Sequence, residues 1–277
     1  MTDNPTFQFF NDHFTFFFYG CYLVLFCLIS IWEYFAPRRP LTHSRLGRWT
    51  KNFFLYLITA VIIQSLSTLT ITNLAYYTWK NGWGLLNILP ISPLVRFFLT
   101  LILLDLMVYL LHVFNHKVHF GWRFHRVHHT DLDLDSTSGV LFHPLEGLFS
   151  FFIRQPFVLL VGPSPEAIFV FDVFFLMVLL LTHANVRVHP LIDRAFRWVF
   201  VTPDMHRIHH SVDWDESNSN YGFSLSGWDR LFKTYRGQSG IPPEKMKLGL
   251  KEFQTPEDLK MVRILALPFL KKREWPK

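Results

Sequence analysis

Repeated histidine motifs are the feature of this sequence with the clearest chemical meaning. The chain has 277 residues, of which 14 are histidine. The motif His-x-x-His-His occurs twice, as "HRVHH" at 125–129 and as "HRIHH" at 206–210, and a His-x-x-x-His pair stands at 112–116. Residues three and four positions apart share one face of a helix, so each motif directs its imidazoles to one place. Because imidazole suits iron, zinc, copper and nickel, the spacing predicts a metal site but does not name the metal.

The number of these histidines exceeds what one metal ion uses. A structural zinc ion takes four protein ligands and a catalytic one about three. Two metal ions, with positions left open for oxygen or water, would use more, and we interpret the two triplets as two ligand sets. His183 ends an apolar run and joins the candidates. The nine candidate ligands are His112, His116, His125, His128, His129, His183, His206, His209 and His210.

A proton pathway is the alternative interpretation of so many histidines. Ionisable groups within membranes often mark such pathways. A pathway requires neither repeated triplets nor clustering at one interface, so metal binding is the favoured interpretation. We interpret His13, His43 and His189 as ordinary polar residues or helix contacts.

Long apolar segments must position these histidines. Hydrophobic residues make up 50% of the chain and charged residues 17%, whereas a soluble domain has about a quarter charged residues. Most apolar segments approach the roughly 20 residues that a helix needs to cross a bilayer. The sequence predicts a single all-α domain over 1–277: a polytopic membrane helix bundle of four to five hydrophobic segments with a helical cap. The segments cover residues 14–35, 53–75, 93–113, 145–161 and 166–182.

Two segments are less regular than the others. Arg154 and Pro156 interrupt the fourth, which predicts a kink or partial insertion. After the polar stretch "DWDESNSNYG", "TPEDLK" at 255–260 reads as a helix start. The apolar and basic residues that follow are expected at the membrane surface or packed on the cap.

The placement of Lys and Arg predicts the orientation of the bundle. The link between the first two segments is rich in basic residues, whereas the next link has only Lys80. The excess of positive charge in cytoplasmic loops puts the first link inside and the second outside. All the histidine motifs then fall on the cytoplasmic side. Membrane-flanking residues account for the net charge of +6, so no nucleic-acid partner is needed. Cys21 and Cys27 indicate neither a disulfide nor a metal site.

An ordered series of motifs resembles the fatty acid hydroxylase / sterol desaturase superfamily of integral membrane oxygenases. The resembling region covers about 105–235, with "DLMVYLLHVFNH", "WRFHRVHHTDLDLDSTSGVLFHPLE", "THANVR", "TPDMHRIHHS" and "NYGFSLSGWDRLFKTY". The resemblance implies a histidine-bound diiron centre that activates dioxygen, with the nine histidines as ligands. Relatives often carry a further histidine where this chain has Leu179. His189 and Asn185 are the candidates to replace it, and His119 is a weaker one.

Further residues receive roles through the same resemblance. Asp105 and Glu146 are expected to orient ligating imidazoles, as carboxylates commonly do; for Asp105 a contact between helices is the alternative. His143 in "HPLE" has a supporting or a helix-starting role. The residues expected to pack the cap around the metals are Asn220, Tyr221, Trp228 and Asp229, and Arg123, Arg126 and Arg207 are considered for the membrane surface.

The resemblance implies an oxidoreductase: a diiron monooxygenase that hydroxylates or desaturates a fatty acyl, sterol or related alkyl lipid. Dioxygen is the co-substrate, and the electrons are expected from a separate donor protein or reductase. Two alternatives remain: a zinc-dependent membrane hydrolase and a non-catalytic membrane protein stabilised by its metals. We expect a bacterial inner membrane location with a cytoplasmic active site, with the endoplasmic reticulum as the alternative.

Overall fold

A computed structural model of the chain describes residues 5–66 and 70–270, and its folded elements are helices. Within these residues, β pairing is limited to three isolated bridges. The α-helices are α1 (Pro5–Phe35), α2 (Arg45–Ser65), α3 (Ile71–Lys80), α4 (Leu85–Ile88), α5 (Pro93–Lys117), α6 (His119–His125), α7 (Pro144–Val161), α8 (Pro165–His183), α9 (Pro190–Phe196), α10 (Pro203–His209), α11 (Trp214–Ser217), α12 (Gly227–Leu231) and α13 (Met261–Ala266). The short 3-10 helices are η2 (His128–Thr130), η3 (Ser136–Val140) and η4 (Leu267–Phe269).

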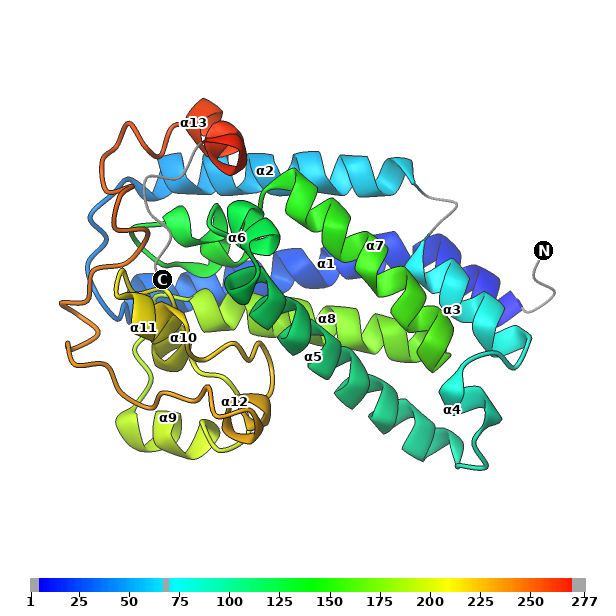
Figure 1. The fold of residues 1–277 in the computed structure, drawn as a ribbon. Helices are drawn as coiled ribbons and strands as arrows, with labels where there is room; N and C mark the ends of the chain where they lie inside the picture. Colours follow the sequence, from blue (N-terminus) through cyan, green and yellow to red (C-terminus); the bar gives the residue numbers. More distant parts are fainter. Residues whose placement is uncertain (1–4, 67–69, 271–277) are drawn as a thin grey trace.

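Four of these helices are long and apolar enough to cross a membrane. They are the 16–35 part of α1 together with α5, α7 and α8. The prediction of a polytopic all-α membrane protein is therefore confirmed. Figure 1 shows α1, α5, α7 and α8 forming the bundle, with the cap, which we define as α6, η2, η3 and α9–α13, gathered at one end of it.

The predicted second segment, 53–75, is not one continuous helix. It divides into α2, which ends at Ser65, and α3, which begins at Ile71. Polar side chains bond to the backbone on both sides of the division: Ser65 Oγ donates to the Ile62 carbonyl, and Thr70 Oγ1 accepts from the Asn73 amide. Such bonds compete with a regular helix. In Figure 1, α2 nevertheless runs beside α1 and returns the chain to the end of the bundle opposite the cap.

The fourth segment forms one helix, α7, which runs from Pro144 to Val161 with Pro156 inside it, and the kink or partial insertion stays a prediction. Arg154 pairs with Asp172 of α8 across 2.7 Å. Pairing of this kind is how charged residues are tolerated within a membrane bundle. Gly162 ends the helix with a φ of 69°, a conformation that glycine adopts without the steric cost of a Cβ.

Part of the segment after residue 260 packs against α6, while its basic end at 271–277 lies outside the described residues. Ile264 and Leu267 are buried in one cluster with Trp122 and Val127. The 255–260 stretch forms turns instead of the expected helix start, although the Asp258 carboxylate accepts from both the amide and the hydroxyl of Thr255, as at a helix N-terminus. The helix begins only at Met261.

Candidate metal centre

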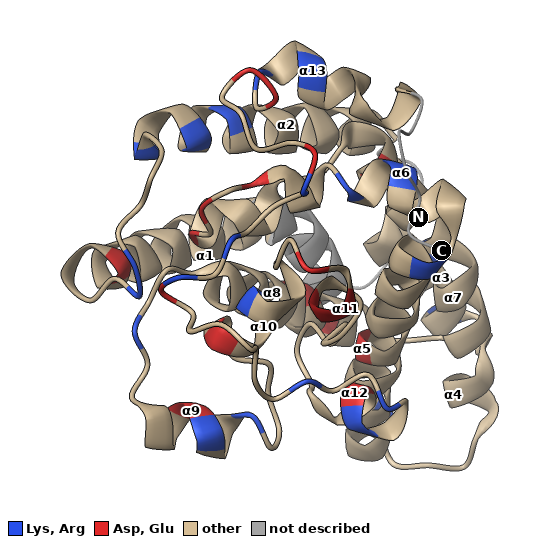
Figure 2. Cartoon of the chain, turned by 60° about the vertical axis from the view of Figure 1, so that its left-hand side comes forward, with Lys and Arg blue, Asp and Glu red and all other residues tan. Residues whose placement is uncertain are grey.

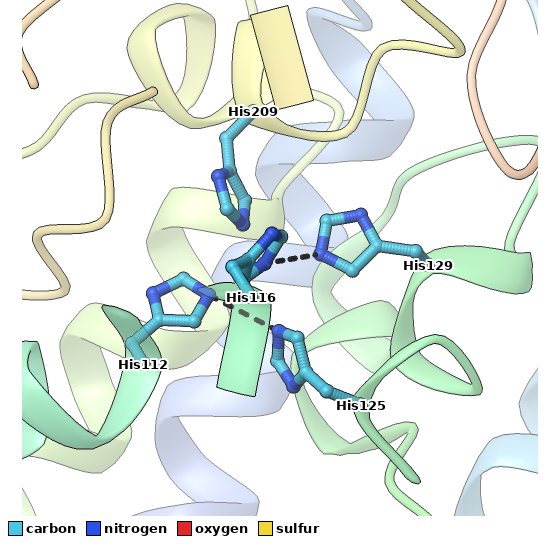
Figure 3. A group of neighbouring side chains, drawn as sticks. All are labelled: His112, His116, His125, His129 and His209. Carbon is cyan, nitrogen blue, oxygen red and sulfur yellow. Dashed lines mark hydrogen bonds between the residues drawn. The ribbon is translucent and has the colours of Figure 1, made fainter. Parts of the chain in front are cut away.

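The nine candidate histidines converge in the cap as two groups. Within each group the ring nitrogens that face inward lie within 4.8 Å of one another, and every ring is buried. The first group holds His112, His116, His125, His129 and His209, and Figure 3 shows these five rings pointing toward a common centre. The second group holds His128, His183, His206 and His210.

Each His-x-x-His-His motif divides between the two groups. In "HRVHH", His125 and His129 belong to the first group and His128 belongs to the second. In "HRIHH", His206 and His210 belong to the second group and His209 belongs to the first. The interpretation of each triplet as one ligand set is therefore wrong. The first and last histidines of each motif are four residues apart and face one group. The middle histidine, three residues after the first, faces the other group.

The distances between ring nitrogens suit metal coordination. In the first group, Nε2 of His112 lies 3.1 Å from Nε2 of His125, and the His116–His129 distance is also 3.1 Å. In the second, the Nε2 atoms are 3.1 Å apart for His128 and His183, 3.0 Å for His183 and His206, and 3.2 Å for His206 and His210. Nitrogens about 2.0–2.1 Å from one ion and at right angles around it would be about 3 Å apart.

Hydrogen bonds on the far side of the rings fix their tautomers. A carbonyl oxygen can only accept, so Nδ1 carries the proton where it meets one. Nδ1 of His112 donates to the Tyr221 carbonyl (2.7 Å), and Nδ1 of His128 donates to the Leu141 carbonyl (3.1 Å). Nδ1 of His183 donates to the Leu179 carbonyl (2.8 Å), and Nδ1 of His209 donates to the Ser219 carbonyl (2.8 Å). In the neutral ring, Nε2 then holds a lone pair.

These tautomers leave buried lone pairs that a bound cation would satisfy. His128 and His183 point two Nε2 lone pairs at each other across 3.1 Å, and neither atom can donate. Nε2 of His209 is buried and without a hydrogen-bond partner among the described residues. Buried polar atoms left without partners are costly. Metal ions between the rings would satisfy these atoms, so the residues present fit a pair of histidine-bound metals.

Burial keeps neutral the histidines of the two groups that lie outside the spanning helices. It lowers the pKa of His125 to about 3 and, with the neighbouring imidazoles, lowers the pKa of His128 and His209 well below the usual value. These rings are therefore already deprotonated at neutral pH, as metal ligands must be.

Glu146 supports the first group as expected. Its carboxylate lies 2.6 Å from Nδ1 of His125 and accepts from Asn115 across 3.2 Å. Asp105 does not contact a histidine: it accepts from Nε1 of Trp228 at 2.9 Å and from the Leu225 amide at 3.3 Å. The alternative of a contact between elements therefore holds for Asp105.

A buried charge network holds η2, which carries one ligand to each group. Arg48 of α2 donates to Asp131 at 2.9 and 2.7 Å and to Asp135 at 2.6 Å. Burial alone would raise the pKa of Asp131, but the charge and hydrogen bonds of Arg48 lower it below its usual range. Arg48 belongs to the basic link from which the orientation was predicted, yet its side chain is buried in this network. The acidic run "DLDLD" directly after the first triplet was the available signal for a buried cationic partner.

The position of the missing family ligand is filled by an apolar side chain. Leu179 is buried in a cluster with Phe223, and its carbonyl accepts from His183. Neither expected substitute enters the groups. The Asn185 side chain is bonded to the Arg39 backbone through both of its polar atoms, and exposed His189 caps α9 by accepting from the Leu191 amide. His119 is exposed and also lies outside both groups.

The cap residues expected around the metals form hydrogen bonds that support the segments carrying the histidines. The Asp229 carboxylate accepts from the amides of Tyr221 and Gly222, and so fixes the carbonyl that receives the His112 proton. Asn220 bonds to the Met205 carbonyl of α10. His143 caps α7 by accepting from the Leu145 amide.

The three arginines considered for the membrane surface lie against cap backbone. Arg123 and Arg126 donate to carbonyls of Pro268 and Leu267. Arg207 is fully buried beside the Ala184 carbonyl and Asp204.

Aromatic rings line both histidine groups on the side of the bundle. Phe142 stacks on His128 with ring centroids 4.6 Å apart, and Phe223 lies 4.7 Å from His112. Phe223 also contacts Phe175 of the spanning helix α8 at 5.4 Å. The centre therefore faces the membrane bundle through an apolar layer that suits an alkyl chain.

Comparison with known proteins places this arrangement in a family. The family model described as fatty acid hydroxylase matches residues 97–234, which contain all nine histidines. The chain belongs to the fatty acid hydroxylase family. It is 29% identical over 245 residues to the ornithine lipid hydroxylase OlsE of Rhizobium tropici, covering 83% of this chain and 70% of that protein.

The family's animal members include further relatives. The chain is 29% identical to the alkylglycerol monooxygenase of Xenopus tropicalis and 27% identical to that of Homo sapiens. These matches cover 62% and 63% of this chain but only 36% and 37% of those proteins. No solved structure matches the chain significantly. The relatives are oxidoreductases that act on lipids, and the chain shares with them the family's histidine-rich region.

Proposed function

We propose that this protein is a membrane-bound diiron oxygenase that hydroxylates a hydrocarbon chain of a membrane lipid. The observation that carries the proposal is the pair of buried groups whose Nε2 lone pairs face one another beside the apolar layer of Phe142 and Phe223. The names of the relatives, a lipid hydroxylase and monooxygenases, favour hydroxylation over desaturation.

Two iron ions held there would supply the redox chemistry that an unactivated C–H bond requires. Hydroxylation inserts one oxygen atom of dioxygen into that bond, and two electrons with two protons reduce the other to water. A separate donor protein supplies the electrons.

The protein's own groups would bind the ions, orient the ligating rings and exclude water from the centre. The nine imidazoles would hold the ions, and the carbonyls of Tyr221, Leu141 and Leu179 keep the rings in the tautomer that binds a metal. Such outer partners orient ligands and raise their basicity. Phe142 and Phe223 cover the centre on the bundle side, where a lipid tail approaches from the bilayer.

The location is part of the same proposal. The basic link before α2 favours a cytoplasmic cap, and we assign the protein to a bacterial inner membrane. The whole chain then acts as one domain around one centre.

The test combines metal analysis with oxygen uptake. We expect anaerobically purified protein to contain two iron ions per chain, and to consume oxygen only with an electron donor and lipid present. His128→Ala and His209→Ala, one from each group, should each abolish the lipid product. His189→Ala is the matched control, because that ring is exposed and lies outside both groups.

Other outcomes separate the alternatives. Zinc at full activity without oxygen uptake would establish a hydrolase instead. Unfolding on chelation with no lipid product from the intact protein would establish a structural metal site.

A further inference from the structure

Two short segments of the cap expose an unusual number of large apolar side chains. The α9–α12 surface, as we call it, consists of Leu191, Ile192, Phe196, Trp198, Val199, Phe200, Leu231 and Phe232. Leu191 is 71% exposed, Trp198 70% and Leu231 65%. Contiguous apolar surface of this kind marks an interaction with a membrane or another protein.

The two segments form one surface. Phe200 pairs with Leu225 in an isolated bridge, and the Ser226 amide donates to the Val199 carbonyl across 3.0 Å. The Arg230 guanidinium of α12 lies 4.9 Å from the ring centroid of Trp198. Figure 1 places α9 and α12 together on one side of the cap.

This surface continues the outer surface of the spanning helices. The ring of Phe200 lies 6.5 Å from that of Phe174 in α8, and the ring of Phe232 stacks on Tyr109 of α5 at 5.3 Å. At 1.5 Å per residue, Tyr109 and Phe174 lie about 12–14 Å before the cap ends of their helices. The α9–α12 surface therefore stands beside the spanning helices, not above their ends.

Basic and aromatic residues accompany the apolar ones. Arg194 and Lys233 are exposed on the two segments, and Figure 2 shows basic residues on both α9 and α12. Arg230 lies between the rings of Trp198 and Tyr235, 3.8 Å from the latter. Tryptophan, tyrosine and basic side chains are enriched where proteins meet lipid headgroups.

We infer that the α9–α12 surface is seated in the headgroup region of the same bilayer that the bundle spans, with Arg194 and Lys233 beside anionic phospholipid headgroups. The continuity with α5 and α8 selects the bilayer as the occupant over a second protein. One consequence concerns the metal centre. The chain passes from this surface directly into α10, which carries ligands of both histidine groups, so the membrane helps to fix α10.

Spin labels on the full-length protein in nanodiscs test this inference. In a background of Cys21→Ser and Cys27→Ser, Ile192→Cys and Glu257→Cys each receive one label. Ile192 is 52% exposed on the α9–α12 surface, whereas the Glu257 side chain is 69% exposed in the turns before α13, away from that surface. We expect the label at 192 about 5–10 Å below the phosphates, protected from a water-soluble relaxant, and the label at 257 in water.

The outcomes are separable. Equal access of the relaxant to both labels would overturn the inference. Spin–spin broadening at 192 that disappears when the labelled protein is diluted with unlabelled protein would show that a second copy covers the surface, and would overturn it too. Unchanged metal content in both variants verifies that the cap is folded.

The anionic preference has its own measurement. Adding phosphatidylglycerol to phosphatidylcholine nanodiscs should move the label at 192 deeper, and the combined Arg194→Gln and Lys233→Gln change should remove that response. A label depth that ignores phosphatidylglycerol in the parent background would contradict the assignment of anionic headgroups.

Discussion

The two histidine groups differ most where a spanning helix enters each of them. Helix α5 gives the first group two rings one turn apart, His112 and His116. Helix α8 gives the second group only His183, because the position one turn earlier is Leu179. The first group thus has five imidazoles and the second four. A six-coordinate ion would keep one open position in the first group and two in the second.

The supports of the two groups differ as well. The first contains the ring oriented by a carboxylate, His125 beside Glu146. In the second, His128 and His183 are oriented by the backbone carbonyls of Leu141 and Leu179. The difference teaches that the first group is the more completely held by protein. The second has one imidazole fewer and lies against the apolar cluster that contains Leu179.

Loss of Arg48, whose ion pairs hold η2, should weaken metal binding in both groups and should have the largest effect of the three changes. Arg48→Met leaves Asp131 and Asp135 buried without their cation, and breaking a buried ion pair from one side costs about 3–5 kcal/mol. We expect this decrease in the free energy of unfolding, measured by denaturation in detergent, with loss of metal from both groups. Arg45→Met, at a partly exposed arginine on the same helix, should change little. Selective loss of one metal in Arg48→Met would show that η2 does not serve both groups.

Removal of the carboxylate should weaken the first group alone. Glu146→Gln cannot stabilise the His125 ring as the carboxylate does, and loss of such a partner typically lowers metal affinity 10–100-fold. Chelator titration should show one weakened and one unchanged ion. Asp105→Asn is the matched control, because Asp105 is a buried carboxylate that contacts Trp228 instead of a histidine. Equal weakening of metal binding in the two variants would contradict the role of Glu146.

Adding an imidazole to the second group should strengthen its metal binding, and we expect this to be the smallest of the three effects. Leu179→His adds an imidazole one turn before His183, at the position where the resemblance predicts a further ligand. We expect the ion of the second group to leave several-fold more slowly in chelator, while the first is unchanged. Leu179→Met keeps the volume of the site and should behave like the parent chain. A faster loss of metal in Leu179→His would show that the apolar side chain is needed for packing.

Much of this centre is readable in the sequence, because helical spacing alone fixes which histidines can share a face. The division of each triplet between two groups is not, since it depends on how η2 and α10 face each other. The partner of Arg48 lies 83 residues away at Asp131, and local pattern cannot pair charges at that separation. Similarly, the four spanning helices follow from hydropathy, but the division of 53–75 depends on local bonds of Ser65 and Thr70.

The division of the motifs is tested most directly by two double variants with equal numbers of rings removed from α10 and its end. His206→Ala with His210→Ala removes two ligands of the second group, whereas His206→Ala with His209→Ala removes one from each. Metal content is measured during chelator titration. The first double variant should keep one ion per chain with the parent's resistance to chelator, and the second should keep no ion with that resistance. If both variants keep one such ion, each motif binds its own metal and the division into a five-histidine and a four-histidine group is wrong.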